Sequence, residues 1–491
     1  MSTPRPARWA LASLSLSMLL PSLATSLAYV ALPTVAAEFD VPFRETQWVV
    51  LAYLTAIPAL TVSAGRMGDV VGRRRLLLAG IATFTAASVL CGVSPTLWLL
   101  VAARAAQGAG AAVMLALSVA LVADTVPPAQ TGRTMGLLGT MSAAGTTLGP
   151  ALGGLAIAGL GWRVLFLAIV PLSSWTAYLT SRYLPTDRPL PTRALSPATL
   201  VSTLLLTLAL GGGAAALSAR PSGEGAVLLG LPLTAAIALG AFAVVEARAA
   251  SPLIRWSMFR RATFTAGLAM NALVAAIMMA TLVVGPFYLS GALELSPTRA
   301  GLAMSVGPLV AALAGVPSGW LVDRRGPSLG AIAGIAAMAA GSLALSMLPL
   351  ALGTIGYLVP IACMTAGYAL FQAANNTDVT GSSGPDERGA VAGLLTLSRN
   401  VGLVTGASVM GAVFAHGSGG GDLTTTPPAT VAAGVRLAFA SASTLALAAL
   451  AIAMHRASRP DPLRRRPNPH DARSHGPTVP VVGSLEPPSP G

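Results

Sequence analysis

Long apolar runs alternate with short polar segments along most of the chain. Because a helix rises about 1.5 Å per residue, about 20 apolar residues are needed to cross the hydrocarbon core of a membrane. Fourteen runs reach that length, starting near residues 10, 46, 76, 97, 134, 163, 198, 226, 264, 298, 328, 354, 389 and 432. The pattern predicts an all-α integral membrane protein with fourteen transmembrane helices.

Composition supports this fold class and narrows the function. Hydrophobic residues make up 54% of the chain and charged residues 10%, whereas soluble domains are about one quarter charged. A soluble enzyme is therefore excluded. The net charge of +13 comes from arginines scattered between apolar runs, so we expect no nucleic-acid partner. Cys91 and Cys363 stand alone in apolar runs, so we expect buried packing roles and no metal site.

The arginines also predict an orientation. With an even number of spans and the amino terminus inside, most of the 30 basic residues fall on the cytoplasmic side, as the positive-inside rule requires. The external arginines are then Arg44, Arg163, Arg220, Arg299 and Arg436. We expect a multi-pass protein of the cytoplasmic membrane, with both termini cytoplasmic. Arg104 and Arg399 fall inside apolar runs, where a charge costs roughly 2.5–3.5 kcal/mol.

Two sets of glycines reveal an internal repeat. The frame Gly65-xxx-Asp69-xx-Gly72 recurs 254 residues later as Gly319-xxx-Asp323-xx-Gly326. Four glycines of the fifth run recur in the thirteenth at a constant offset of 257: Gly136, Gly145, Gly149 and Gly154 match Gly393, Gly402, Gly406 and Gly411. We predict an amino-terminal six-helix bundle (1–185), an inserted pair, helices 7 and 8 with linkers (186–262), a carboxy-terminal six-helix bundle (263–456) and a disordered cytoplasmic tail (457–491).

Four motifs carry a specific resemblance. The turn after the second run contains Gly65 to Arg75, the fourth run reads R-x-x-Q-G-x-G-A-A from Arg104, the fifth reads G-x-x-x-G-P-x-x-G-G from Gly145, and the sixth opens with Trp162-Arg163. Together they resemble the major facilitator superfamily, in particular its 14-helix drug:proton antiporters, over about residues 9–455. The resemblance implies two six-helix bundles around a central cavity that opens alternately to each side.

The resemblance assigns a conformational latch to the first motif and its repeat. In the family, the aspartate faces a helix amino terminus across the domain interface, and an arginine pairs with an acid at the inner end of helix 4. Asp69, Arg74 and Asp124 match those positions, while Val70 replaces the usual basic residue. The expected latch comprises Gly65, Asp69, Gly72, Arg73, Arg74, Asp323 and Arg324.

The intramembrane arginines are the predicted transport residues. Arg104 cannot lose its proton in practice, so it can lower the pKa of a nearby acid or attract an anionic group. The alternative is a structural arginine satisfied by backbone carbonyls and Gln107. With proton coupling included, the expected set is Arg104, Gln107, Asp124 and Arg399. Trp162 and Arg163 are expected to anchor the outer membrane interface.

The fifth-run motif predicts a gate. Pro150 bends the helix, and the glycines present a smooth surface to the opposite bundle; exporters of the family use such a surface against leak. The expected gate residues are Gly145, Gly149, Pro150, Gly153 and Gly154. Helix 13 has Ala407 where helix 5 has Pro150, so the amino-terminal half alone carries the full motif.

One departure bears on mechanism. The family's helix 1 has an aspartate where this chain has Ala24, and we expect Glu38, Asp40, Glu45, Asp124, Glu246 and Asp378 to lie mostly in solvated positions near the membrane surfaces. No acid is placed at the midplane. Candidate substrate-cavity residues are Trp48, Tyr53, Asn271, Phe371, Gln372, Asn375 and Asn376, with adjacent amides that need partners in an apolar helix.

The function predicted from these features is export of drugs or antibiotics by proton antiport, with alternating access. The expected partners are a lipophilic small molecule, protons and the bilayer, the expected form is a monomer, and no cofactor is needed beyond the proton gradient. A transporter of a small anionic metabolite using Arg104 and Arg399 is the alternative, followed by a non-transporting receptor. A membrane enzyme is disfavoured because the spans contain no His/Cys/Asp/Glu cluster.

Overall fold

The computed structural model describes residues 5–126, 131–187, 261–381, 388–419 and 426–458, together with single residues between 201 and 245. Within these residues the chain is helical, without strands. The amino-terminal half contains α1 (Arg5–Phe39), α2 (Phe43–Thr46), α3 (Trp48–Val71), α4 (Arg73–Val93), α5 (Leu97–Thr125), α6 (Thr131–Leu160), α7 (Arg163–Leu167) and α8 (Ile169–Tyr183). The carboxy-terminal half contains α11 (Ala262–Met279), η3 (Ala280–Val284), α12 (Gly285–Phe287), η4 (Tyr288–Ala292), α13 (Pro297–Arg325), α14 (Pro327–Ser346), η5 (Leu350–Leu352), α15 (Gly353–Gly381), α16 (Arg388–Gly417) and α17 (Pro428–Ala457).

The helix starts agree with the hydropathy pattern over most of the chain. Every predicted start outside the inserted pair lies within about five residues of an observed one, the largest shift being at α1, which begins at Arg5. Ten of the described helices are long and apolar enough to cross a membrane. The predicted starts near 198 and 226, like most of 186–262, lie outside the described residues. Phe242 from this stretch packs with Phe264 and Val391 of the carboxy-terminal half.

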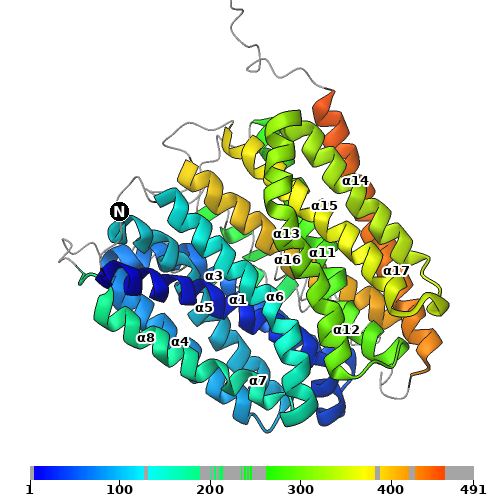
Figure 1. Ribbon diagram of the computed structural model, residues 1–491, viewed down its shortest axis with the longest axis horizontal. Helices are drawn as coiled ribbons and strands as arrows, with labels where there is room; N and C mark the ends of the chain where they lie inside the picture. The colour runs from blue at the N-terminus through cyan, green and yellow to red at the C-terminus, as the bar shows by residue number, and fades with distance from the viewer. Residues whose placement is uncertain are drawn as a thin grey trace, which may run out of the picture.

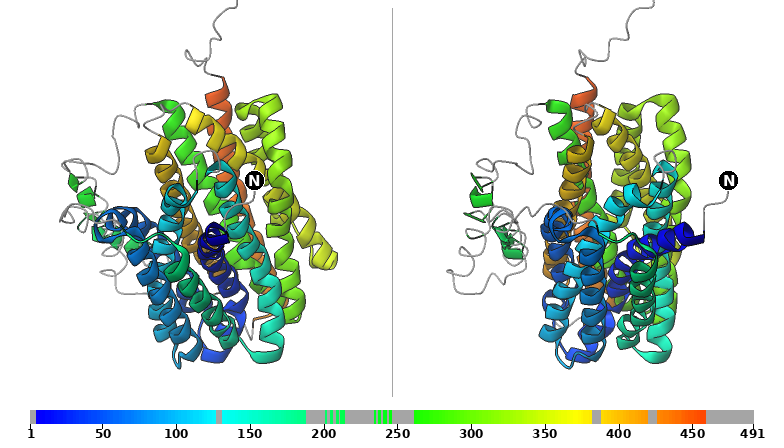
Figure 2. Two further views of the ribbon diagram at one scale, coloured as in Figure 1. Left: turned by 60° about the vertical axis from the view of Figure 1, so that its left-hand side comes forward. Right: turned by 90° about the vertical axis from the view of Figure 1, so that its left-hand side faces the viewer.

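The helices form two groups that follow the order of the chain. In Figure 1, α1 to α8, coloured blue to teal, lie beside α11 to α17, coloured green to orange. In the two views of Figure 2, which bring the amino-terminal group forward, its helices overlap those of the carboxy-terminal group along the line of view. Within the groups, α1 packs against α6 and α5, and α11 packs against α16 and α17. Between the groups, α6 packs against α13, and α3 packs against α16.

The internal repeat appears as matched backbone geometry. Gly72 between α3 and α4 and Gly326 between α13 and α14 have φ of 105° and 85°, the left-handed region that glycine tolerates without a steric cost. A Cβ at Gly149 would lie 2.7 Å from Cβ of Ser26 in α1, and a Cβ at Gly406 would lie 2.4 Å from Cα of Ala276 in α11. The equivalent helix pairs therefore approach at the same repeat positions.

The two ends of the bundle are named here by one residue each. The Glu38 end holds the end of α1, the α6–α7 junction, the start of α13 and the end of α16. The Arg74 end holds the α3–α4 and α13–α14 junctions and the ends of α8 and α17. Both the start of α1 and the end of α17 lie at the Arg74 end.

The two cysteines differ in exposure. Cys91 is buried, as expected, whereas Cys363 is exposed, so the prediction for Cys363 is wrong. Its thiol lies 3.5 Å from the carbonyl oxygen of Ala337, on the neighbouring helix α14. An apolar run of membrane-spanning length has a lipid-facing side, and periodicity alone did not place Cys363 on it.

Candidate functional site

Arg104 lies in the interior of the amino-terminal half. It projects from α5 and is fully buried. Its Nε donates to the carbonyl of Val49 on α3 (2.9 Å), and Nη1 lies 3.4 Å from the carbonyl oxygen of Ala24 on α1. The guanidinium carbon lies 4.1 Å from the centroid of the Tyr53 ring, a cation–π distance. Arg104 thus connects α5 to both α1 and α3.

Gln107 extends this network to a fourth helix. Nη1 of Arg104 donates to Oε1 of Gln107, and Nε2 of Gln107 donates to the Ser88 hydroxyl on α4 (2.7 Å). These contacts match the structural reading of the motif. The structural role alone does not account for every donor of Arg104, because its Nη2 is buried and has no hydrogen-bond partner. Leaving a charged donor unpaired in the interior is costly, so one nitrogen of Arg104 stays available for another group.

No carboxylate balances this charge among the ion pairs of the described residues, which join Arg163 to Glu38 and Arg456 to Asp378. Ala24 is fully buried, and its backbone carbonyl oxygen faces Arg104. In the antiporters that the chain resembles, the residue at this position is an aspartate. Arg399, the second intramembrane arginine, lies in the middle of α16 and is exposed. The structure does not bring Arg104 and Arg399 together.

The predicted latch contains a partner that the sequence did not reveal. The carboxylate of Asp187, just after α8, accepts hydrogen bonds from the backbone N–H groups of Arg74 (2.9 Å) and Arg75 (3.0 Å). It therefore caps the amino terminus of α4, where backbone donors and the helix dipole favour an anion. A Cβ at Gly72 would lie 2.5 Å from Cγ of Asp187, so the glycine makes room for the carboxylate.

The latch arginines reach two different helices. The Arg74 guanidinium donates to the carbonyl of Ser181 on α8, and Nη1 of Arg73 lies 3.4 Å from the carbonyl oxygen of Ala120 on α5. The side chains of Asp69 and Asp124 lie outside the described residues, so their roles stay predictions. A Cβ at Gly65 would meet nothing within 4 Å, whereas one at Gly68 would lie 2.6 Å from Leu117 of α5. Gly68, not Gly65, makes the close helix contact.

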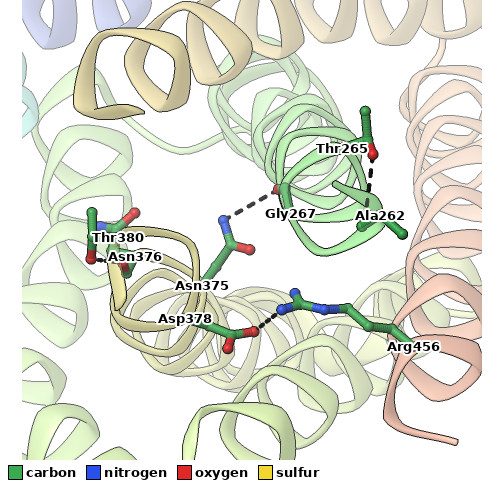
Figure 3. A network of polar contacts seen from close by, with 8 residues as sticks. All are labelled: Ala262, Thr265, Gly267, Asn375, Asn376, Asp378, Thr380 and Arg456. Atoms are coloured by element: carbon green, nitrogen blue, oxygen red, sulfur yellow. Dashed lines mark hydrogen bonds and ion pairs between the residues drawn. The ribbon is translucent and has the colours of Figure 1, made fainter. Parts of the chain in front are cut away.

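The corresponding end of the carboxy-terminal half has a different arrangement. Asp323 is exposed, and the Arg324 guanidinium lies 3.9 Å from the Trp320 ring centroid. Asp378 of α15 pairs with Arg456 of α17, as Figure 3 shows. The Asp378 side chain is 13% exposed, so the prediction of a solvated carboxylate is wrong there. This pair joins two helices near the Arg74 end.

The gate motif faces both bundles. A Cβ at Gly145 would lie 2.5 Å from the carbonyl oxygen of Leu19 on α1, and Gly149 and Gly153 also face α1. Gly154 faces the other half, because a Cβ there would lie 2.5 Å from the Pro297 carbonyl oxygen. A Cβ at Gly301 of α13 would lie 2.3 Å from the Pro150 carbonyl oxygen. Contrary to expectation, most of the motif glycines serve packing within one half, and the crossing point is Pro150 and Gly154.

Aromatic rings join the halves at the same end. Phe43 of α2 contacts Phe287 of α12 and Phe414 of α16, with ring centroids 4.8 and 5.0 Å apart. All three are buried. A Cβ at Gly411 would lie 2.1 Å from Oε1 of Gln47, so α16 also approaches α3 closely here. At the Arg74 end of α6 and α13, by contrast, a Cβ at Gly139, Gly315 or Gly319 would meet nothing within 4 Å.

The candidate cavity residues divide by burial. Tyr53, Asn271, Phe371 and Asn375 are buried, Trp48 and Gln372 are half-buried, and Asn376 is exposed. Tyr53 donates to the Pro21 carbonyl (2.9 Å), Asn271 to the Leu395 carbonyl (2.8 Å) and Gln372 to the Tyr368 hydroxyl (2.8 Å). Asn375 reaches the Gly267 carbonyl at 3.3 Å (Figure 3). The carbonyl oxygens of Asn271 and Asn375 have no partner.

Trp162 and Arg163 hold a carboxylate. The indole N–H of Trp162 and the Arg163 guanidinium donate to the two oxygens of Glu38 at the end of α1. Trp162 is 1% exposed, so its predicted role as a membrane-interface anchor is wrong. Arg163 also donates to the Ser94 carbonyl (3.2 Å). This clamp ties α1 to the α6–α7 junction, and Glu38 is more than a solvated loop residue.

Comparison with known proteins settles the family. The model of the Major Facilitator Superfamily matches residues 14–407, well over half of the chain. This protein belongs to the Major Facilitator Superfamily. The family consists of membrane transporters, so the chain is a multi-pass membrane protein and not an enzyme. Its all-helical fold and internal repeat agree with that membership.

Individual relatives differ in what they transport. The chain is 30% identical to the drug efflux pump JefA of Mycobacterium tuberculosis, covering 84% of this chain and 81% of that protein. It is 27% identical to the riboflavin transporter RibZ of Clostridioides difficile, covering 80% and 84%. A solved bacterial homolog of the human lysosomal transporter Spinster, inward-facing and unoccupied, matches with a TM-score of 0.68 at 16% identity, covering 94% of this chain and 100% of that one.

Proposed function

We propose that this protein is a 14-helix exporter of lipophilic drugs or antibiotics, driven by proton antiport through alternating access. The observation that carries the proposal is the asymmetric contact between the halves. Pro150 and Gly154 meet α13 at the Glu38 end, while Gly139, Gly315 and Gly319 at the Arg74 end have open space where a Cβ would be. The crossing point lies within the motif that the family's antiporters use as a gate.

The proposed orientation puts the Arg74 end in the cytoplasm. Arg73, Arg74, Arg75, Arg324, Arg325 and Arg456 lie at that end, whereas Arg44, Arg163, Arg299 and Arg436 lie at the Glu38 end. The positive-inside rule favours this orientation, with both termini cytoplasmic. The conformation described is then closed to the outside, the state in which an exporter loads its substrate from the cytoplasm.

Arg104 supplies the fixed charge in this proposal. Its Nη2 has no hydrogen-bond partner, and its contacts with α1 and α3 from α5 let a local change reach several helices of one bundle. We assign Asp378, paired with Arg456 in a largely buried position, as a candidate carrier of the coupled proton beside Asp124. Similarity to JefA, named as a drug efflux pump, favours the export reading.

A small anionic metabolite is the second candidate substrate. The specific observation in its favour is the buried Arg104 without an acidic partner, which suits a negatively charged or strongly hydrogen-bonding substrate. RibZ, named as a riboflavin transporter, shows that a relative of this chain is named for a polar metabolite and not for a drug. In this case the substrate, not an aspartate on α1, supplies the counter-charge.

Compound accumulation distinguishes these functions. Cells that express the chain are loaded with a neutral lipophilic antibiotic or with a radiolabelled small organic acid, with and without a protonophore. The exporter proposal expects lower antibiotic accumulation than in cells carrying the Arg104→Ala variant, with the difference removed by the protonophore. Equal antibiotic accumulation combined with altered content of the organic acid would favour the anionic-metabolite candidate instead.

A further inference from the structure

A cavity of about 430 Å³ opens at the Glu38 end, directly beside the contact between the halves. Pro33 and Ala36 of α1 line one side, and Phe287, Ser290, Glu294 and Val431 of the carboxy-terminal half line the other. Cavities of about 300–1,000 Å³ hold drug-sized ligands. A molecule in this cavity would touch both halves at once.

The cavity shares a wall with the aromatic contact between the halves. The Phe287 ring faces Phe43 of the other half at 4.8 Å and also lines the cavity. Separating the halves at this end would part Pro33 and Ala36 from Phe287. The cavity in this form therefore exists only while the Glu38 end is closed.

The described lining is mostly apolar and contains one carboxylate. Pro427, just before α17, and Pro428, its first residue, add to the apolar wall, and Glu294 is the one ionisable residue among the described lining residues. The described ion pairs do not include Glu294. An aromatic face beside a carboxylate is the combination that binds organic cations. A hydrophobic cation satisfies both parts of such a wall.

The backbone around Glu294 is unusual. Glu294 has φ of +52°, a conformation that a non-glycine residue adopts at a cost of roughly 1–3 kcal/mol and that clusters at ligand sites. Ser290 and Gly291 belong to the π-helical segment η4, Tyr288–Ala292. Such segments are rare and occur frequently at functional sites. Glu294 and two residues of the widened helix turn, Ser290 and Gly291, all line the cavity.

We propose that this cavity is a binding site for an amphiphilic organic cation, and that the bound cation holds the Glu38 end closed. A ligand shifts an equilibrium toward the conformation that it binds more tightly, and this site is complete only in the closed one. The site is separate from Arg104 and from the transported compound. It rests on the proposed function only for the statement that the Glu38 end faces outward.

The test uses two probes of almost the same shape and opposite charge. Binding of tetraphenylphosphonium and tetraphenylborate to the purified full chain in detergent is measured by calorimetry. We expect the phosphonium to bind and Glu294→Gln to raise its Kd about threefold, since the variant removes a partly exposed ion pair and leaves the aromatic contact in place. Asp40→Asn is the matched control, because Asp40 is also exposed, has φ of +49° and lies outside the lining.

A second variant fills the cavity. A Cβ at Gly291 would be in ordinary contact with Val431 at 3.6 Å, and Gly291 lines the cavity, so the longer side chain of Gly291→Leu should occupy cavity space and abolish phosphonium binding. Equal Kd values for both probes, an unchanged Kd in Glu294→Gln, an equal effect of Asp40→Asn, or retained binding in Gly291→Leu would each overturn the proposal. A chain that binds the phosphonium but exports nothing would refute the proposed function and leave this site standing.

The effect on conformation is measured with spin labels at the Arg74 end. Val70 of α3 and Leu329 of α14 are exposed there, one in each half, and cysteines at these positions are labelled after replacement of Cys91 and Cys363. We expect tetraphenylphosphonium to increase the population with the longer distance between labels. A shift to the shorter distance, or no shift at a saturating concentration, would contradict the closed-state preference.

Discussion

The close contact between α1 and α6 allows a quantitative prediction for Gly149→Ala. The new Cβ would lie 1.8 Å from Oγ and 2.7 Å from Cβ of Ser26, and 3.2 Å from the Leu27 nitrogen. Rotating the Ser26 side chain removes the first clash but not the second. Because carbon atoms pack at about 3.5–4.0 Å, the two helices must separate by roughly 1 Å. Overpacking of this kind costs about 1–3 kcal/mol.

Gly159→Ala is the matched control in the same helix, because a Cβ there meets nothing within 4 Å. Both variants gain about 1 kcal/mol of helix propensity, so their difference isolates the clash. We expect Gly149→Ala to be about 1–3 kcal/mol less stable than Gly159→Ala, measured by equilibrium unfolding in mixed micelles. Ser26→Gly in the Gly149→Ala background removes the remaining clash and should restore much of the loss. Equal stability of the two alanine variants would refute the packing argument.

Three other predictions follow from the charged sites. Arg104→Ala should abolish efflux but retain membrane insertion, measured by the fluorescence of a fused reporter. Arg104→Lys should retain only part of the efflux, because the planar fork of five donors is lost. Undiminished export by Arg104→Ala would exclude a transport role. Asp187→Ala should lower the stability of the amino-terminal half by about 1 kcal/mol, since two backbone donors of α4 lose their acceptor. Asp187→Asn should lower the stability less. Equal melting temperatures for both variants and the parent would refute the capping role. Ala24→Asp should place a carboxylate beside Arg104 and improve the resistance of cells to ethidium-like cations relative to neutral antibiotics. Strong ethidium efflux by the parent, unchanged in the variant, would show that other residues determine the preference for substrate charge.

Most of the fold could be predicted from hydropathy and internal repeats. The helix starts outside 186–262 follow from apolar length alone, since a membrane leaves few other ways to satisfy the backbone. The matched glycines indicated a duplication, and in the structure Gly149 and Gly406 lie at matched helix contacts, because close helix approach in a membrane uses small residues at fixed spacing. The motif at Arg104 also indicated the contact with Gln107, three residues along the same helix.

Contacts between distant parts of the chain could not be predicted from the sequence. Asp187 caps a helix that begins more than a hundred residues earlier, and its own neighbourhood, between Pro185 and Pro189, reads as an ordinary linker. The signal that was available is Gly72, whose left-handed backbone leaves space for a side chain from elsewhere. Glu38 was expected to be solvated for the same reason, because its partners Trp162 and Arg163 are separated from it in the chain by five helices, α2 to α6.

Substrate residues were the hardest to predict. A polar or aromatic side chain in an apolar helix either faces a cavity or satisfies a neighbouring backbone, and the sequence does not distinguish the two. Tyr53 and Asn271 satisfy carbonyls of Pro21 and Leu395, in buried positions. The cavity at the Glu38 end is lined by residues of several separate elements, including Pro33 of α1, Phe287 of α12 and Glu294 after η4, which share no sequence period.

Proton-coupled export is tested most directly with the purified protein in liposomes. An imposed pH difference drives a neutral lipophilic antibiotic, while an enclosed pH indicator reports proton movement in the same sample. We expect opposite fluxes of antibiotic and protons, both lost in Arg104→Ala and both stopped by a protonophore. Antibiotic flux that continues without a pH difference, or proton flux unaffected by the antibiotic, would contradict the account.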